Sequence, residues 1–238
     1  PTFIIIIQQV VYMTDMDPVP AATVVLVREA SNLEILLLQR NTKLVFHGGH
    51  WVFPGGRLDK ADYEYSQENL EYPAALRAAV RETREEAGVD IEENDLIHTA
   101  HWTTPPNQPR RFSTWFFICP LKESVSVSID NAEILDYRWI SPRQALEDAE
   151  AKKWVLPRPT MTTLSDIVDH TDLKSLVSAV TVARVRVFPA NSEYYRPEEM
   201  GYMVQAWHLQ LLMIKLKKKN QLFKLGIHLL KNYYLKLV

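Results

Sequence analysis

Three glutamates in the middle of the chain have the spacing of a binding site for divalent cations. Glu82, Glu85 and Glu86 stand in an i, i+3, i+4 relation, so on an α-helix their carboxylates share one face. Like charges this close repel one another unless a cation lies between them, and carboxylate oxygens are ligands that Mg²⁺ and Mn²⁺ prefer. The spacing therefore predicts a metal site. The alternative is a solvated acidic face paired with arginines such as Arg81.

A glycine-rich turn precedes these glutamates. Residues 53–56 read Phe-Pro-Gly-Gly, a rigid turn followed by two residues, Gly55 and Gly56, that can adopt positive φ. Such freedom lets backbone carbonyl groups approach a ligand closely. Further along, alanines at 74, 75, 78 and 79 give a helix a small-residue face for tight packing, and Gly88 suits the left-handed position that ends it.

Turn and helix together resemble the Nudix box, G-x5-E-x7-R-E-U-x-E-E-x-G-U, in which U is a bulky aliphatic residue. The matching residues are Gly56, Arg81, Glu82, Glu85, Glu86, Gly88 and Val89. Thr83 departs from the aliphatic position. The larger departure is an insertion, because 24 residues separate Gly56 from Arg81 where the pattern has 13. Counting back from Arg81 puts Pro73 where the first box glutamate belongs, which leaves Glu68 and Glu71 as unassigned candidates.

The resemblance implies an α/β fold, the Nudix α/β/α sandwich with a mixed central sheet. It implies hydrolysis of a nucleoside diphosphate linked to another moiety, with Mg²⁺ or Mn²⁺ as cofactor. The metal ligands would be the carbonyl of Gly56 and the carboxylates of Glu82, Glu85 and Glu86. Arg81 would orient a box glutamate.

The general base is less sharply indicated by the resemblance. Glu82 and Glu85 are candidates within the box, and a carboxylate outside the box often helps. Glu133, which directly precedes a predicted strand, is the first choice for that outside carboxylate, and Asp136 is the second. A charge on a surface loop is the alternative interpretation of Glu133.

Upstream residues partly resemble the coenzyme A diphosphatase signature, L-L-T-x-R-[SA]-x3-R-x3-G-x3-F-P-G-G. The matches are Leu36, Leu37, Arg40, Gly49 and residues 53–56, whereas Leu38, Asn41 and Val45 depart. This branch implies coenzyme A or acyl-CoA as substrate, with Arg40, Arg110 and Arg111 binding its phosphates. Each arginine could equally form a surface ion pair. ADP-ribose or NADH as substrate, or a Nudix-fold ligand sensor without catalysis, are the alternatives.

Composition is that of an ordinary globular protein. The 238 residues are 47% hydrophobic and 24% charged, which allows one domain with a sizeable core. The lone Cys119 lies in an apolar run, and we expect a buried, inert thiol and a reducing, cytoplasmic location. The sequence has no run of about 18 apolar residues, so no transmembrane helix is predicted. We expect a small-molecule diphosphate as the substrate, and we expect no nucleic acid as a partner. A homodimer is also considered.

The chain divides into two predicted parts, a Nudix domain over 13–207 and a basic amphipathic extension over 208–238. From Gly201 onward there are seven lysines and no acidic residue, although the whole chain carries a net charge of −2. Such a segment suits a membrane surface or a nucleic acid. We favour the simpler interpretation of a weakly specified extension outside the catalytic domain.

Periodicity and turn residues predict the elements that position the site. Strands are expected at 21–28, 34–39, 97–102, 113–119, 125–129, 134–140 and 181–188. The box helix is expected to carry Pro73 at its first position, and a second helix should begin with Ser141 as cap and Pro142 after it. Further helices are expected at 160–170 and 172–180. The insertion at 59–72 should form a surface loop or short helix over the cleft. His47 and His50 are expected in a loop, more plausibly touching substrate or solvent than metal.

Overall fold

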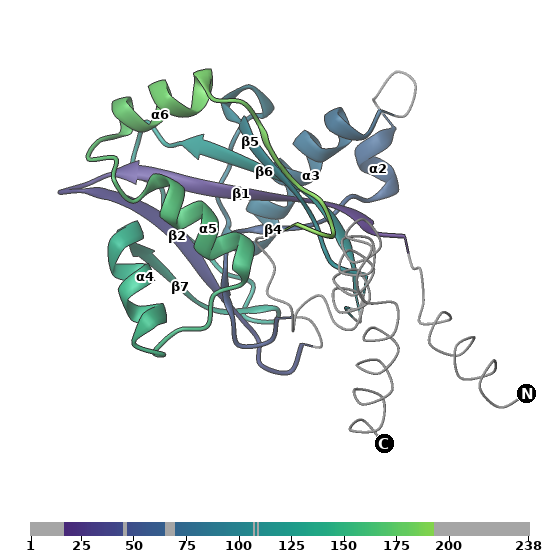
Figure 1. The fold of residues 1–238 in the computed structure, drawn as a ribbon, viewed down its shortest axis with the longest axis horizontal. Helices are drawn as coiled ribbons and strands as arrows, with labels where there is room; N and C mark the ends of the chain where they lie inside the picture. Colours follow the sequence, from purple (N-terminus) through teal and green to yellow (C-terminus); the bar gives the residue numbers. More distant parts are fainter. Residues whose placement is uncertain (1–16, 45–46, 65–69, 107, 109, 193–238) are drawn as a thin grey trace, which may run out of the picture. The chain divides into compact units, whose positions relative to one another are not determined.

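A mixed eight-stranded sheet forms the centre of the protein (Figure 1). The computed structural model describes residues 17–44, 47–64, 70–106, 108 and 110–192, all within one unit, Asp15–Tyr194. The main path through the sheet runs β3-β2-β1-β6-β5-β8, with β4 paired to β1 and β7 paired to β2. The strands are β1 (Val19–Glu29), β2 (Leu33–Arg40), β3 (Trp51–Val52), β4 (Gly55–Arg57), β5 (Ile97–Thr103), β6 (Phe112–Pro120), β7 (Ile134–Ile140) and β8 (Arg186–Phe188).

The strand pairings bring segments from far apart in the sequence to one place. β1 and β2 form an antiparallel hairpin, as their β-branched and apolar residues predict, and β1 pairs in parallel with β6. β4 pairs with β1 so that Gly56 lies opposite Ala22. The glycine turn is therefore held against the central strand rather than left on a free loop.

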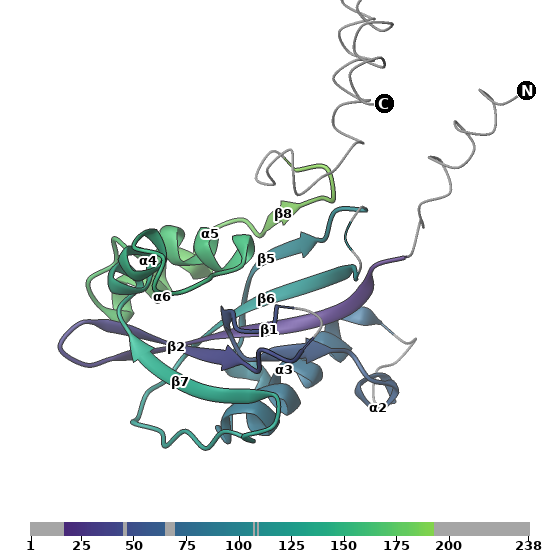
Figure 2. The ribbon, with the colours of Figure 1, turned by 90° about the horizontal axis from the view of Figure 1, so that it is seen from below.

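Helices cover both faces of the sheet. Figure 2 shows α2 and α3 on one face and α4, α5 and α6 on the other. This arrangement confirms the predicted α/β/α architecture. The helices are α2 (Lys60–Tyr63), α3 (Glu71–Ala87), α4 (Pro142–Glu150), α5 (Arg158–Ile167) and α6 (Leu173–Val182), with a short 3₁₀ turn at Glu93–Asp95.

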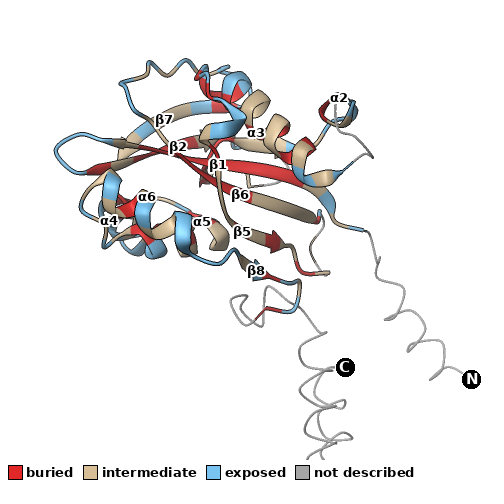
Figure 3. Ribbon diagram, turned by 90° about the horizontal axis from the view of Figure 1, so that it is seen from above, coloured by how far each residue is buried: buried red, intermediate tan, exposed pale blue. Residues whose placement is uncertain are grey.

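The predicted box helix is α3, and its alanine face explains how closely it packs on the sheet. Ala74, Ala75, Ala78 and Ala79 are all fully buried, as Figure 3 shows by the red segments of α3. Small side chains let the helix backbone approach β1 and β6, whose inward residues include Val24, Leu26 and Phe117. Cys119 is buried in the same cluster, and burial raises the pKa of its thiol to about 12. The prediction of a buried thiol is thus confirmed.

Helix ends follow local sequence rules. Ser141 caps α4 by accepting a hydrogen bond from the backbone N–H of Gln144, with Pro142 at the start of the helix. Gly88 ends α3 with φ of 66°, and a side chain there would lie 2.9 Å from the carbonyl oxygen of Ser128. Both ends were predicted from residue type alone.

Three details of the prediction are wrong. Pro73 is the third residue of α3, not the first, because the helix begins at Glu71; the first N–H groups of a helix lack internal partners, so proline is tolerated there. Residues 125–129 form no strand, although Val125, Val127 and Ile129 pack against the core. Residues 181–182 belong to α6, so only Arg186–Phe188 of the expected last strand is extended.

Two other predictions fall largely outside the described residues. The extension at 208–238 lies wholly outside them, and so does the domain boundary at residue 207. Within residues 59–72, α2 forms the predicted short helix, while residues 65–69 are not described. In the part of the chain that is described, no helix is long and apolar enough to cross a membrane.

Candidate active site

The glycine turn is clamped onto β1. The carbonyl of Pro54 accepts hydrogen bonds from the backbone N–H of Val24 at 2.9 Å and from the hydroxyl of Thr23 at 2.8 Å. A side chain at Gly55 would meet the carbonyl oxygen of Ala22 at 2.3 Å. The turn therefore lies directly against the backbone of β1, which fixes the position of the next residue, Gly56.

Glu86 reaches this turn from α3 and is buried there. Its Oε2 accepts the backbone N–H of Gly55 at 2.9 Å, and only 7% of the residue is exposed. Burial raises the pKa of Glu86 to about 8, although the Gly55 hydrogen bond and the nearby Arg40 oppose that shift. A cation beside this carboxylate would therefore bind it best in its ionised form.

Glu82, one helical turn earlier, lies directly against Gly56. A Cβ atom added to Gly56 would lie 2.2 Å from Oε1 of Glu82, so no larger residue fits while Glu82 keeps this position. Burial raises the pKa of Glu82 as well, while its hydrogen bond with Arg81 lowers it. Two carboxylates of α3 thus converge on the glycine turn, as the helical spacing predicts.

Arg81 ties the acidic groups together from the other side. It donates to Oε1 of Glu82 at 2.8 Å, to Oε2 of Glu85 at 3.1 Å and to the carbonyl of Arg57 at 2.9 Å. Its remaining donors face the buried carboxylate of Asp62, at 3.0 and 3.3 Å. The orienting role expected of Arg81 matches these contacts.

Asp62 is the site residue that the sequence analysis missed. Counting back from Arg81 crosses the insertion and ends at Pro73, with Glu71 and Glu68 as the nearby acids. Counting forward from Gly56 by the pattern G-x5-E reaches Asp62, an acid of the same charge. The insertion therefore lies after this position, and Glu71 instead accepts the indole N–H of Trp115 at 2.7 Å.

Glu85 is placed differently from the other two glutamates. Its side chain is 58% exposed and lines an open cleft of about 330 Å³ along α3. Asp62, Arg77, Val80, Arg81, Arg84 and Glu93 line the same cleft. Neither Glu82 nor Glu86 lines this cleft, so Glu85 is the exposed member of the three glutamates.

Arg40 and Glu133 complete the arrangement from β2 and from the loop before β7. Arg40 lies 3.5 Å from Glu86 and 3.6 Å from Glu133, which brings the predicted outside carboxylate to the edge of the site. The second choice, Asp136, instead pairs with Arg138 at 2.7 Å. Beside Arg40, His47 is held neutral because burial lowers its pKa to about 4.

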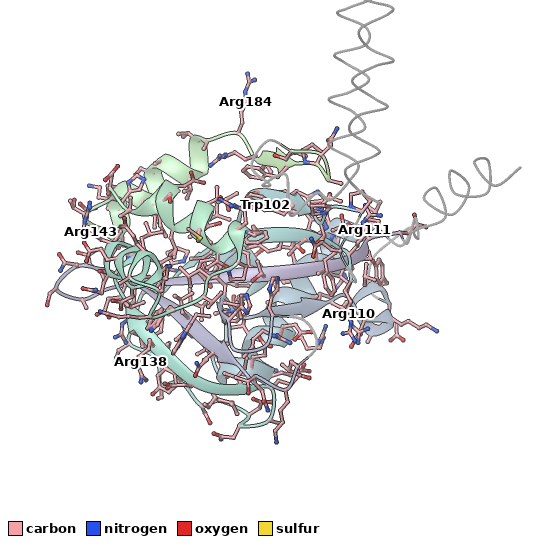
Figure 4. All side chains as sticks on the ribbon, turned by 60° about the horizontal axis from the view of Figure 1, so that its bottom comes forward. Trp102, Arg110, Arg111, Arg138, Arg143 and Arg184 are labelled. Carbon is pink, nitrogen blue, oxygen red and sulfur yellow. The ribbon has the colours of Figure 1, made fainter. Side chains whose placement is uncertain are left out.

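The other two predicted phosphate-binding arginines lie where β1 and β6 begin (Figure 4). Arg110 is exposed. Arg111 is buried, and its Nε donates to the carbonyl of Thr104 at 3.2 Å, which holds the loop before β6. Phosphate binding by either residue stays a prediction.

The donor set suits a hard divalent cation, although its members are held by arginines. Among the described residues, no three acidic, histidine or cysteine side chains are arranged around one point as they stand. Glu82 and Glu85 accept from Arg81, and Glu86 is shared between Gly55 and Arg40. The buried carboxylates beside a glycine backbone that admits no side chain nonetheless fit Mg²⁺ or Mn²⁺.

Comparison with known proteins agrees with this geometry. The NUDIX domain matches residues 17–161. A Caenorhabditis elegans protein assigned to the nudix hydrolases is 28% identical over 187 residues, which are 63% of this chain and 61% of that protein. The acyl-coenzyme A diphosphatases NUDT19 of Xenopus laevis and Homo sapiens are 36% identical over 85 and 83 residues, which are 34% of this chain and 22% of each relative. The chain thus spans less than two thirds of these relatives.

A solved structure shares the fold. The NUDIX hydrolase from Alicyclobacillus acidocaldarius superposes with a TM-score of 0.63 and 23% identity, covering 72% of this chain and all of that one. At this identity the likeness concerns the fold alone. The domain match covers more than half of the sequence, and the glycine turn, α3 and their carboxylates all lie within it. The chain therefore belongs to the Nudix hydrolase family.

Proposed function

We propose that this protein is a metal-dependent hydrolase that cleaves the diphosphate bond of a nucleoside diphosphate linked to another moiety, with coenzyme A or acyl-CoA as substrate. The observation that carries the proposal is the convergence of Glu82 and Glu86 on the backbone of Gly55 and Gly56. That convergence joins the two halves of the box across the insertion.

In this proposal Mg²⁺ or Mn²⁺ is held by the carbonyl of Gly56 and the carboxylates of Glu82, Glu85 and Glu86. When bound, it would neutralise phosphate charge and lower the pKa of a water. The protein's own groups prepare the site for it. The N–H of Gly55 orients Glu86, and Arg81 orients Glu82 and Glu85.

Proton transfer falls to a carboxylate near the attacking water. We assign the general base to Glu133, whose side chain is 60% exposed and faces Arg40 at the rim of the site. Glu82 and Glu85 accept hydrogen bonds from Arg81 at 2.8 and 3.1 Å, whereas the contact between Glu133 and Arg40 is longer, at 3.6 Å. Glu133 is the better placed of the three to accept a proton and release it to solvent.

The substrate class is supported by sequence rather than by a bound ligand. Two of the relatives are named acyl-coenzyme A diphosphatases, and each matches about a third of this chain. The partial coenzyme A signature, including Arg40 and the Phe-Pro-Gly-Gly turn, lies on β2 and on the turn that leads into β4. A cytoplasmic location and a homodimer stay predictions.

A panel of diphosphates tests the proposal. Coenzyme A, acyl-CoA, ADP-ribose and NADH would be incubated with the protein and Mn²⁺, and the products identified by mass spectrometry. Phosphopantetheine plus a 3′-phosphorylated AMP from coenzyme A is the expected result. Preferential cleavage of ADP-ribose or NADH would reassign the substrate. Cleavage of none of them, with metal present, would favour the non-catalytic ligand sensor.

A further inference from the structure

Arg40, the last residue of β2, connects two carboxylates that come from distant parts of the sequence. Its Nη1 lies 3.5 Å from Oε1 of Glu86, and its Nη2 lies 3.6 Å from Oε2 of Glu133. The other oxygen of Glu86 accepts the N–H of Gly55. A single guanidinium therefore links the acidic interior of the site to the exposed carboxylate at its rim.

The backbone at Arg40 is shaped to aim this side chain. The pairing of β2 with β7 shifts register here, because Gln39 lies opposite Asp136 whereas Arg40 lies opposite Ile134. Such irregularities re-aim a side chain beside a functional site. The N–H of Arg40 donates to the carbonyl of His50 at 3.0 Å, and its carbonyl accepts from Gly49 at 2.9 Å.

The backbone of Glu133 is fixed from the same strand. Its N–H donates to Oδ2 of Asp130 at 2.9 Å, and its carbonyl accepts the N–H of Asn41 at 2.7 Å. The side chain of Asn41 also donates to the carbonyl of Ala132 at 2.8 Å. The residue that follows Arg40 thus anchors the loop that Arg40 faces, and only the carboxylate of Glu133 is left to be oriented.

The contacts of Arg40 suit a group that offsets charge and holds geometry. The side chain is only 18% exposed, and its Nε is buried without a hydrogen-bond partner among the residues that the structure describes. Both ion-pair distances exceed the 2.7–2.9 Å that is typical of a charge-assisted hydrogen bond. Arg40 therefore attracts the carboxylates of Glu86 and Glu133 by its charge rather than by short hydrogen bonds.

We propose that Arg40 is a positioning residue that holds Glu133 beside Glu86, so that the carboxylate of Glu133 faces the water attacking the diphosphate. This inference rests on the proposed function, and it replaces the phosphate-binding role that the sequence suggested for Arg40. Because Arg40 shares Glu86 with any divalent cation, the same contact weakens cation binding.

A double-mutant cycle tests the positioning role. Arg40→Gln should lower kcat roughly 100-fold, as expected for a misplaced catalytic group, with little change in KM because no substrate contact is lost. Combined with Glu133→Gln, it should lower kcat no further than Glu133→Gln alone, since Arg40 acts through Glu133. Losses that multiply in the double variant, or a raised KM with unchanged kcat, would overturn the proposal.

Calorimetric titration with Mn²⁺ gives a readout that is independent of turnover. Arg40→Gln should bind Mn²⁺ several-fold more tightly, because the competing cation beside Glu86 is gone. Weaker binding by the folded variant would contradict the proposal. If wild-type protein cleaves no diphosphate, the proposed function fails, while this titration still tests the contact between Arg40 and Glu86.

Two further variants guard against loss of folding. Arg40→Lys keeps the charge and should retain part of kcat, with KM and Mn²⁺ affinity near wild type; if Arg40→Gln does not fold, a raised KM in Arg40→Lys overturns the proposal. Arg28→Gln is the matched control, because Arg28 is also partly buried and ion-paired, to Glu34 at 2.6 Å. It should leave kcat and Mn²⁺ affinity unchanged.

Discussion

At the scale of single residues, the site depends on Asp62, a buried acid of α2. Asp62 is 4% exposed and accepts two hydrogen bonds from Arg81, and its Oδ2 also accepts the N–H of Asp59 at 2.7 Å. Arg81 in turn fixes Glu82 and Glu85. Asp62 therefore acts on the carboxylates of α3 through the guanidinium between them.

Replacing Asp62 with alanine should destabilise the protein by about 3 kcal/mol, because the charged hydrogen bonds that this buried carboxylate accepts from Arg81 and from the N–H of Asp59 are lost. Urea-induced unfolding measures this loss. Asp59→Asn is the matched control, since Asp59 is 65% exposed and lies 4.0 Å from Arg81. Its cost should stay below about 1 kcal/mol, as for a surface ion pair. Equal costs would show that Asp62 has no special role.

The protonation of Glu86 predicts how stability depends on pH. Burial raises its pKa from the ordinary 4.5 to about 8, so the folded protein retains a proton that the unfolded chain has released. This contribution is fully present below pH 4.5 and is lost as the pH rises towards 8. In EDTA, the wild type should therefore lose more thermal stability across this window than Glu86→Gln does. Parallel profiles for the two proteins would contradict the shift.

Mn²⁺ should have the opposite pH dependence. Because a bound cation requires ionised Glu86, the rise in Tm on adding Mn²⁺ should be larger at pH 8.5 than at pH 6. Differential scanning fluorimetry at matched ionic strength measures it. A Tm increase that is the same at both pH values would mean that Glu86 does not take part in binding.

At the scale of elements, the two box glycines, Gly56 and Gly88, have different roles. The three atoms nearest to a methyl group at Gly56 all belong to the carboxylate of Glu82, the flexible end of a side chain, whereas a methyl group at Gly88 meets the backbone of Ser128 at a φ of 66°. Gly56→Ala should therefore abolish most activity at little cost in stability. Gly88→Ala should cost about 1–2 kcal/mol and leave kcat nearly intact. Activity assays and urea unfolding of both variants test the pair.

The elements themselves could largely be predicted from sequence. Apolar and β-branched residues, in runs or in alternation, predicted β1, β2, β5, β6 and β7, and in β1 and β2 the buried residues are consecutive, so both faces of these two strands are covered. Residues 125–129 have the same alternation and pack on the core, yet they add no strand to the sheet. Periodicity reports which side chains are buried, and it carries no information about which backbone is available to pair.

The site was harder to predict than the fold because it depends on contacts across the sequence. Local spacing predicted that Glu82, Glu85 and Glu86 share one face, and Glu82 and Glu86 do lie at the glycine turn, whereas the side chain of Glu85 is 58% exposed. Asp62 could have been found by counting forward from Gly56 rather than back from Arg81. The bridging position of Arg40 depends on a register shift between β2 and β7, and such an arrangement leaves little signal in neighbouring residues.

At the scale of the whole molecule, the sheet and α3 bring four segments of the chain close together. β4 carries Gly55 and Gly56, α3 carries the glutamates, β2 ends at Arg40, and Glu133 lies in the loop before β7. The helices on the opposite face, α4 to α6, contribute none of these groups. The groups of the proposed site thus lie on the α3 side of the sheet and near β2 and β7.

The most direct test of this account is a calorimetric titration of Mn²⁺ into the chelator-treated 238-residue protein at pH 8. The wild type should bind Mn²⁺, Glu82→Gln and Glu86→Gln should each bind it at least about tenfold more weakly, and Glu34→Gln, on the surface of β2, should bind it as the wild type does. If Glu82→Gln and Glu86→Gln bind Mn²⁺ as tightly as the wild type, the carboxylates on the glycine turn do not form the metal site, and the account is wrong.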